Sequence, residues 1–241
     1  MVRCAASSLA SGKGAEIFSD NFDRANSQSE GSGVVLDSNS WTKKFFGSQR
    51  NWTGINNNAT EIAAESASGR GGLYVRSAEN INLIADKITV SYKIKFSATN
   101  AGLNSHLLVC GYNVNSSGNP QDNSGLDVYL QGGNSTVNFN LNGVNIFSQN
   151  NNIFTLSNTW YRVKIYSDKR NVKLKAWLDG SSEPLAWNID FRASQEFPVF
   201  GYNYLGFGLV STNTGSYWLI LDDFKLQKNI EIVNILYQLP A

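Results

Sequence analysis

Apolar and polar residues alternate one by one along much of this chain. This period of two is typical of β-strands that bury one face and expose the other. It is clearest in four segments, residues 87–97, 135–141, 159–167 and 172–178. Because antiparallel sheets commonly pack one face on a core and leave the other in water, we expect these segments to be antiparallel strands. The side chains predicted to be buried between two sheets include Tyr92, Ile94, Phe139, Val163 and Leu174.

Shorter apolar runs predict further strands. They lie at residues 17–22, 41–46, 52–55, 61–64, 72–76, 81–84, 106–112, 126–131, 205–210 and 217–226. Clusters of Gly, Ser and Asn at 66–72, 113–125 and 150–152 predict turns between them. The pair Asp179-Gly180 predicts a hairpin turn. Many short strands with turns at this spacing, and no long helical pattern before residue 228, favour a β-sandwich or barrel.

The composition narrows the class of protein. The chain has 241 residues, a length that a single β-sandwich can use. Only 16% are charged, against about 25% in an average soluble protein, and the net charge is +1. Without concentrated positive charge we expect no nucleic-acid partner. No stretch approaches 18 apolar residues, so we expect no membrane span. Polarity comes instead from 30 Asn and 28 Ser.

The two ends differ from the alternating middle. Residues 1–16 lack the apolar run of a secretory signal, and we expect a flexible arm. Residues 228–241 form an apolar extension. Four of its side chains, at the i, i+3, i+4, i+7 spacing of an amphipathic helix, are Ile232, Ile235, Leu236 and Leu239. We predict that they pack on their own domain or dock on another chain, which makes them candidate assembly residues. The same segment could extend as a strand.

The order of several short motifs resembles the concanavalin A-like lectin/glucanase jelly rolls, including laminin-G-like domains. The motifs are Phe18-Ser-Asp20-Asn-Phe22-Asp-Arg24-Ala-Asn26, Trp41, Trp52, Asn158-Thr-Trp160-Tyr161-Arg162, Lys175-Ala-Trp177-Leu-Asp179-Gly180, Gly206-Phe-Gly208 and Leu221-Asp222-Asp223-Phe224. Similar modules occur in bacterial carbohydrate-binding proteins and in bacteriophage virion proteins. The resemblance covers about residues 17–227. It implies an all-β, two-sheet antiparallel jelly-roll sandwich whose concave face or edge loops can bind sugars.

The sequence offers little for catalysis. The Glu-x-Asp-x-x-Glu motif of the family's glucanases is absent, and Glu61 and Glu65 have a different spacing. The single histidine, His106, has no Gln-x-His motif around it, unlike the histidine of the family's lyases. We therefore predict no catalytic residues. A polysaccharide hydrolase or lyase is kept as an alternative.

Sugar recognition needs aromatic faces beside amides and hydroxyls. Alternation in residues 126–131 places Asp127, Tyr129 and Gln131 in one row, opposite an apolar row. We predict that this row is an exposed carbohydrate-binding strip. Trp177 falls on the polar face of its strand with Lys173 and Lys175. It is either a second platform for a sugar or is covered by a loop.

A structural calcium ion is implied by the same resemblance. Relatives with this terminal strand often hold Ca²⁺ between it and the first strand, and here Asp20, Asn21 and Asp222 could contribute oxygens. Alternation places Asp222 in an apolar row with Trp218, Ile220, Phe224 and Leu226, where a carboxylate must be paired. Arg24 is the alternative partner.

Together these features favour a non-enzymatic virion structural or decoration protein with a lectin-like domain that binds host-surface carbohydrate. Its expected partners are other virion subunits or further copies of itself, and glycans. A carbohydrate-binding module or lectin of a secreted protein, located outside the cell, is the first alternative.

Overall fold

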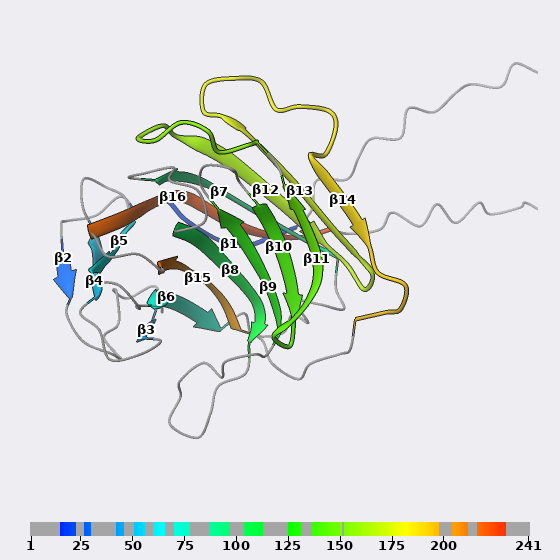
Figure 1. The fold of residues 1–241 in the computed structure, drawn as a ribbon, viewed down its shortest axis with the longest axis horizontal. Coiled ribbons are helices and arrows are strands. Elements are labelled where there is room, and N and C mark those ends of the chain that lie inside the picture. The colour runs from blue at the N-terminus through cyan, green and yellow to red at the C-terminus, as the bar shows by residue number, and fades with distance from the viewer. Residues whose placement is uncertain are drawn as a thin grey trace, which may run out of the picture.

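The computed structural model describes thirteen stretches of the chain: residues 15–22, 27–29, 42–45, 51–55, 60–65, 70–77, 87–96, 104–112, 125–131, 136–150, 152–197, 204–211 and 216–229. All regular elements in these stretches are β-strands, arranged in two layers (Figure 1). Among the described residues there is accordingly no helix that could cross a membrane.

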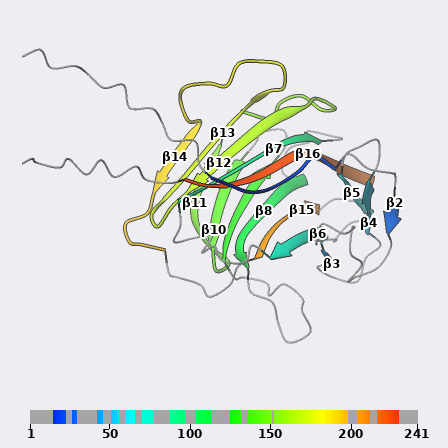
Figure 2. The same cartoon turned by 180° about the vertical axis from the view of Figure 1, so that it is seen from behind.

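The first layer is a nine-stranded sheet. Its order is β14 (Ile189–Arg192), β13 (Asn171–Leu178), β12 (Tyr161–Ser167), β7 (Ile88–Phe96), β16 (Ser216–Lys228), β5 (Thr60–Glu65), β4 (Asn51–Ile55) and β2 (Ser27–Ser29). The ninth strand, β1 (Ala15–Asp20), pairs with β16, and the two run together in Figure 2.

The second layer is a seven-stranded sheet. Its order is β11 (Val144–Asn150), β10 (Thr136–Leu141), β9 (Leu126–Gln131), β8 (Asn104–Tyr112), β15 (Tyr204–Ser211), β6 (Arg70–Ser77) and β3 (Thr42–Phe45). The chain crosses repeatedly between the layers: β7 lies in one sheet and β8 in the other, and β15 and β16 are divided in the same way. All pairings are antiparallel, which confirms the predicted two-sheet jelly-roll sandwich.

The core lies between the sheets and follows the predicted alternation. Tyr92, Ile94, Phe139, Val163 and Leu174 are at most 2% exposed, as predicted. Aromatic rings pack across the two layers. The ring of Phe224 in β16 stacks on Tyr92 within its own sheet, and its centroid lies 5.6 Å from that of Phe207 in β15 of the other sheet. The central strands whose side chains are described, such as β7, β10 and β12, therefore have an inner face in the core and an outer face turned away from it.

Three features differ from the sequence prediction. The strands β2, β11 and β14 were not predicted, and all three are edge strands with little or no apolar alternation. Asp179-Gly180 forms the predicted turn, closed by a 3.1 Å hydrogen bond from the amide of Ser181 to the carbonyl of Leu178, but the connection between the antiparallel strands β13 and β14 is longer and runs over residues 179–188. Leu178, expected on the inner face, is 40% exposed at the end of β13.

A β-bulge in β16 overturns the predicted apolar row around Asp222. Asp222 pairs with Lys93 and Lys225 pairs with Ser91, so two residues of β16 lie opposite Tyr92. Asp223 is the extra residue, and its φ of 50° is in the left-handed region. Before the bulge Leu219 and Leu221 face the core, and after it Phe224 and Leu226 do, while Trp218, Ile220 and Asp222 face outward. The bulge thus keeps a carboxylate out of the core.

The predicted terminal extensions are only partly described. Strand β1 begins at Ala15, two residues inside the predicted arm, and β16 ends at Lys228. The candidate assembly residues Ile232, Ile235, Leu236 and Leu239 lie outside the described residues. The same is true of Arg24 and of the strand predicted at 81–84.

Candidate functional site

The predicted row on β9 lies on the outer face of the seven-stranded sheet. Leu126, Val128 and Leu130 are fully buried in the core, so Asp127 and Tyr129 point to the other side. Tyr129 is half-buried. Asp127 is only 4% exposed, so the expectation of an exposed carboxylate is wrong at that position. Gln131 ends the strand in the same row, but its side chain is outside the described part.

Asparagine amides flank this row on its β10 side, while its partners on β8 are Leu107 and Val109. Asn138 of β10 is the cross-strand partner of Tyr129, and Asn140 is the partner of Asp127. Asn145 of β11 donates from Nδ2 to Oδ1 of Asn140 across 3.0 Å and to the carbonyl of Phe147 across 3.2 Å. The result is a half-buried tyrosine beside a fixed amide pair, the combination of apolar face and neutral polar groups that suits a sugar ring.

Trp177 lies on the opposite side of the molecule, on the outer face of the nine-stranded sheet. Its cross-strand partner is Arg162 of β12, and the ring is half-buried. The structure therefore does not bring the four predicted carbohydrate-binding residues together. It places Asp127, Tyr129 and Gln131 on one outer face and Trp177 on the other.

The connection 179–188 returns over the outer face near Trp177. Lys175 donates to the carbonyl of Pro184 across 2.9 Å, forms an ion pair with Glu183 at 2.6 Å and lies 4.8 Å from the ring centre of Trp187. These contacts leave Lys175 only 7% exposed. Glu183 also accepts from Lys164 at 2.7 Å, which together with Lys175 holds the pKa of Glu183 below its ordinary value despite burial. Ionic contacts thus occupy the neighbourhood of Trp177.

Three carboxylates gather farther along the same face. Lys93 lies 2.9 Å from Asp223 and 3.9 Å from both Asp179 and Asp222, while Nε of Arg162 lies 2.6 Å from Asp179. Burial and the neighbouring carboxylates raise the pKa of Asp222. The hydrogen bond to Asp223 raises the pKa of Lys93. Because the cluster contains its own cations, these carboxylates form a salt-bridge network.

The residues proposed for calcium do not converge. Asp20 is 4% exposed, lies opposite Phe224 on the inner side and accepts from the backbone amide of Phe22 at 2.8 Å. Asp222 lies on the outer face beside Lys93. Within the described ranges, no group of three or more His, Cys, Asp or Glu side chains is placed to hold a metal ion. Asp20 and Asp222 therefore point to different faces, which does not fit a calcium ion held by both.

The carboxylates and histidine considered for catalysis lie on separate sheets. Glu61 and Glu65 are both in β5, and His106 is in β8, where its register partners are Leu130 and Leu209. Only their backbone positions are described.

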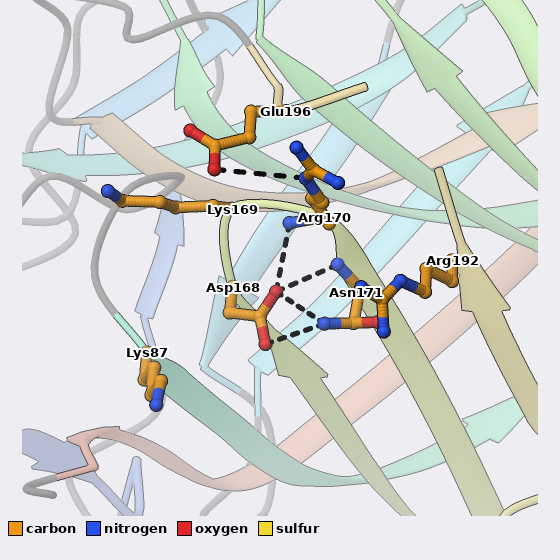
Figure 3. Close-up of a pocket in the computed structure, with 7 residues that line it drawn as sticks. All are labelled: Lys87, Asp168, Lys169, Arg170, Asn171, Arg192 and Glu196. Carbon is orange, nitrogen blue, oxygen red and sulfur yellow. Dashed lines mark hydrogen bonds and ion pairs between the residues drawn. The ribbon is translucent and has the colours of Figure 1, made fainter. Parts of the chain in front are cut away.

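A pocket that the sequence did not reveal lies at the turn between β12 and β13 (Figure 3). It has a volume of about 380 Å³, within the range of small-molecule sites. Three separate segments line it, through the side chains of Lys87, Asp168, Lys169, Arg170, Asn171, Arg192 and Glu196. Four of these are cationic and two are acidic, so the lining has a formal surplus of two positive charges.

Backbone hydrogen bonds fix two of the three segments, the turn 168–171 and the segment after β14. The amide of Asp168 donates to the carbonyl of Asn171 and closes the turn. The amides of Ala193 and Phe197 donate to the carbonyls of Arg170 and Lys169, at 2.8 and 2.7 Å, and hold the segment after β14 against the turn. Phe197 is 5% exposed and anchors that segment in the core. The pocket is therefore built on strand ends whose positions are set by the sandwich.

Asp168 is the centre of the turn. Its Oδ1 accepts from the amides of Arg170 and Asn171, its Oδ2 accepts from the hydroxyl of Tyr166, and both accept from Nδ2 of Asn171. Burial alone would raise the pKa of Asp168, but these donors outweigh it and lower the pKa. Burial, then the bond to Asp168, raises the pKa of Tyr166 to about 12. The carboxylate is committed to holding the turn.

The pocket had no contiguous signal in the sequence. Residue 87, the turn 168–171 and residues 192–196 meet only because β7, β12, β13 and β14 are adjacent in one sheet. The only local sign was the charged sequence Asp168-Lys-Arg-Asn between two alternating segments.

Comparison with known proteins gives structural likeness without sequence kinship. No protein-family model matches the chain, and no curated protein matches it. Among solved structures, Rv0315 of Mycobacterium tuberculosis, described as an immunostimulatory antigen and pseudo beta-1,3-glucanase, matches at a TM-score of 0.59 and 14% identity, over 90% of this chain and 100% of that one.

Two further structures show the same architecture. The exoplasmic/lumenal domain of VIP36 in its Ca²⁺-bound form matches at a TM-score of 0.56 and 13% identity, over 81% of this chain and 85% of that one. The binding domain of botulinum neurotoxin DC, solved with rat synaptotagmin II, matches at a TM-score of 0.54 and 14% sequence identity, over 90% of this chain. The chain spans 49% of the length of that neurotoxin domain. With its two antiparallel sheets and these neighbours, the chain has the concanavalin A-like jelly-roll fold.

Proposed function

We propose that this chain is a non-enzymatic carbohydrate-binding domain that displays its site on a virion surface. The observation that carries the binding proposal is the half-buried Tyr129 with Asn138 as its cross-strand partner and the bonded pair Asn140 and Asn145 on the neighbouring strands. The fold neighbours support it. VIP36 has been solved with Ca²⁺ and Man3GlcNAc bound, on the same fold.

The ligand that fits this surface is a neutral sugar. A pyranose presents an apolar face that can stack on the Tyr129 ring, and its hydroxyls can both donate to and accept from asparagine amides. The described part of the surface is rich in amides and has one carboxylate, Asp127, which is buried. Trp177 is the weaker candidate, because ion pairs of Arg162 and Lys175 surround it.

The non-enzymatic proposal rests on the carboxylates. Glycoside hydrolysis requires one acidic group that is available as a proton donor and a second as base or nucleophile. The described cluster of Asp179, Asp222 and Asp223 surrounds Lys93 and Arg162, so its negative charge serves ion pairs.

The virion location is supported by composition. The 30 Asn and 28 Ser residues provide a polar surface with few charges, and residues 228–241 add an apolar segment suited to contact with a neighbouring subunit. Deletion of residues 229–241 should leave a folded sandwich that no longer assembles. Sedimentation of the full-length and truncated chains tests this, and a full-length chain that stays monomeric at all concentrations would remove the assembly proposal.

A glycan array probed with the purified chain tests the binding proposal. We expect neutral oligosaccharides to be retained. The same oligosaccharides and a panel of polysaccharides are then incubated with the chain, and reducing ends and unsaturated products are measured. Retention without turnover supports the proposal. Released products that disappear in Glu61→Gln or His106→Ala would establish the enzyme alternative instead.

A further inference from the structure

The pocket at the β12–β13 turn contains cations that the fold does not use. Arg170 forms an ion pair with Glu196 at 3.7 Å, and Asp168 is committed to the turn. The side chains of Lys169 and Arg192 have no ionic or hydrogen-bonding partner among the residues described, and both are exposed. Figure 3 shows them on two sides of the pocket, with no contact drawn to either.

Unused cations around a preformed cavity are the lining expected of an anion site. Charge-assisted hydrogen bonds from Lys and Arg to carboxylate, sulfate or phosphate are about twice as strong as neutral ones. The one carboxylate deep in the lining cannot compete for these cations, because five hydrogen bonds from the turn and Tyr166 already saturate Asp168. The charges of Lys169 and Arg192 are therefore available to whatever enters the pocket.

The size and the other polar atoms favour a ligand larger than a bare ion. A volume of about 380 Å³ can hold a sugar ring as well as its charged group. Nδ2 of Asn171 donates a bifurcated hydrogen bond to both carboxylate oxygens of Asp168, and its Oδ1 can accept from a hydroxyl. The lining thus offers cations for an oxyanion together with a neutral acceptor.

We propose that this pocket binds the oxyanion, carboxylate or sulfate, of an acidic sugar residue, with Lys169 and Arg192 as its principal ligands. The choice of a sugar as the carrier of the charge rests on the proposed carbohydrate-binding function. The pocket lies at the strand ends of the nine-stranded sheet, beside the β12–β13 turn. Tyr129 lies on the outer face of the other sheet, so the two sites are separate.

The test is titration of the full chain with four probes. Calorimetry measures the affinity, and the backbone amide NMR signals of residues 169–171 report where the probe binds. The probes are glucuronate, glucose 6-sulfate, glucose and inorganic sulfate. We expect both acidic sugars to bind and to shift these signals, glucose to leave them unchanged, and inorganic sulfate to bind at least tenfold more weakly than glucose 6-sulfate. Affinity for the acidic sugars should fall as the salt concentration rises.

Two variants and a matched control locate the site. Lys169→Gln and Arg192→Gln should each weaken glucuronate binding about tenfold or more, the loss expected for one hydrogen bond to a charged group. The control is Lys173→Gln, which also removes a lysine from the β12–β13 strand pair. Lys173 lies outside the pocket lining and forms an ion pair with Asp190 at 2.8 Å. The Lys173→Gln variant should therefore bind glucuronate as tightly as the wild type. All three positions are at the surface, and thermal melts confirm that the variants fold.

Three results would overturn the proposal: acidic sugars that do not bind, glucuronate affinity unchanged in both variants, or inorganic sulfate that binds as tightly as glucose 6-sulfate. None of them affects binding of neutral sugars at Tyr129, so failure here is distinguishable from failure of the proposed function.

Discussion

Tyr166 and Asp168 share a hydrogen bond at the end of β12: the phenolic hydroxyl donates to Oδ2 of the carboxylate across 2.9 Å. The bond requires a protonated tyrosine and an ionised aspartate. Burial is the larger cause and this hydrogen bond the second cause that raise the pKa of Tyr166 to about 12. The same bond contributes to the lowered pKa of Asp168. The turn that carries Lys169 and Arg170 is thus held by a group that titrates in alkali.

Stability should fall in alkali because of Tyr166. Its ordinary pKa is 10.0 and its folded value is about 12, so above pH 10 the unfolded chain loses this proton before the folded one does. The contribution of Tyr166 is fully present below pH 10 and is lost as the pH rises toward 12. Urea unfolding of wild type and Tyr166→Phe across this range checks it. The variant should show a shallower decline, and equal slopes would contradict the assignment.

Phe139→Ala should lower the free energy of unfolding by about 3–5 kcal/mol. The ring is fully buried and stacks on Phe147 at 5.0 Å between centroids. Val144→Ala, at a position 64% exposed in the β10–β11 hairpin, is the control and should change stability by less than about 0.5 kcal/mol. Equal effects in denaturant unfolding would mean that Phe139 is not in the core.

Deletion of Asp223 should be tolerated although it lies in the middle of a thirteen-residue strand. Asp223 is the extra residue of the bulge, so its removal restores regular alternation while Leu219, Leu221, Phe224 and Leu226 stay in the core. The cost is the ion pair to Lys93. Deletion of Ile220, which belongs to the regular pairing, should instead prevent folding, because one residue of slippage reverses the faces. Circular dichroism and thermal melts separate the two, and a Δ223 chain that unfolds would refute the bulge.

Ser167→Ala should stabilise the fold, by about 1 kcal/mol. Ser167 is 2% exposed at the inner end of β12, between Ile88 and Val172, and its hydroxyl has no hydrogen-bonding partner within the described structure. Ser148→Ala, on an exposed position of β11, is the control and should have little effect. A destabilised Ser167→Ala protein would show that the hydroxyl is satisfied.

The sequence predicted the sandwich but only part of the site, for physical reasons that differ. Alternation in 87–97 and 159–167 reports directly which side chains are buried, because the period of two is a property of every regular strand. A bulge breaks that period, so Asp222 was assigned to the wrong face. The tyrosine of the β9 row was placed correctly for the same reason that the core was. The cations around Asp168 could not be grouped, since only strand adjacency in the sheet brings Lys87, Lys169 and Arg192 to one pocket.

The central claim is that the amide-rich face around Tyr129 binds sugar, and the most direct measurement compares Tyr129→Ala with Trp177→Ala. The two aromatic residues lie on opposite outer faces of the sandwich, and neither is fully buried. The neutral glycan retained most strongly on the array is titrated into wild type and both variants by calorimetry. The account predicts that Tyr129→Ala loses about 2 kcal/mol of binding free energy, as for truncation of an aromatic residue that dominates a binding site, and that Trp177→Ala binds like the wild type. Wild-type affinity in Tyr129→Ala would contradict it, and a loss confined to Trp177→Ala would move the site to the nine-stranded sheet.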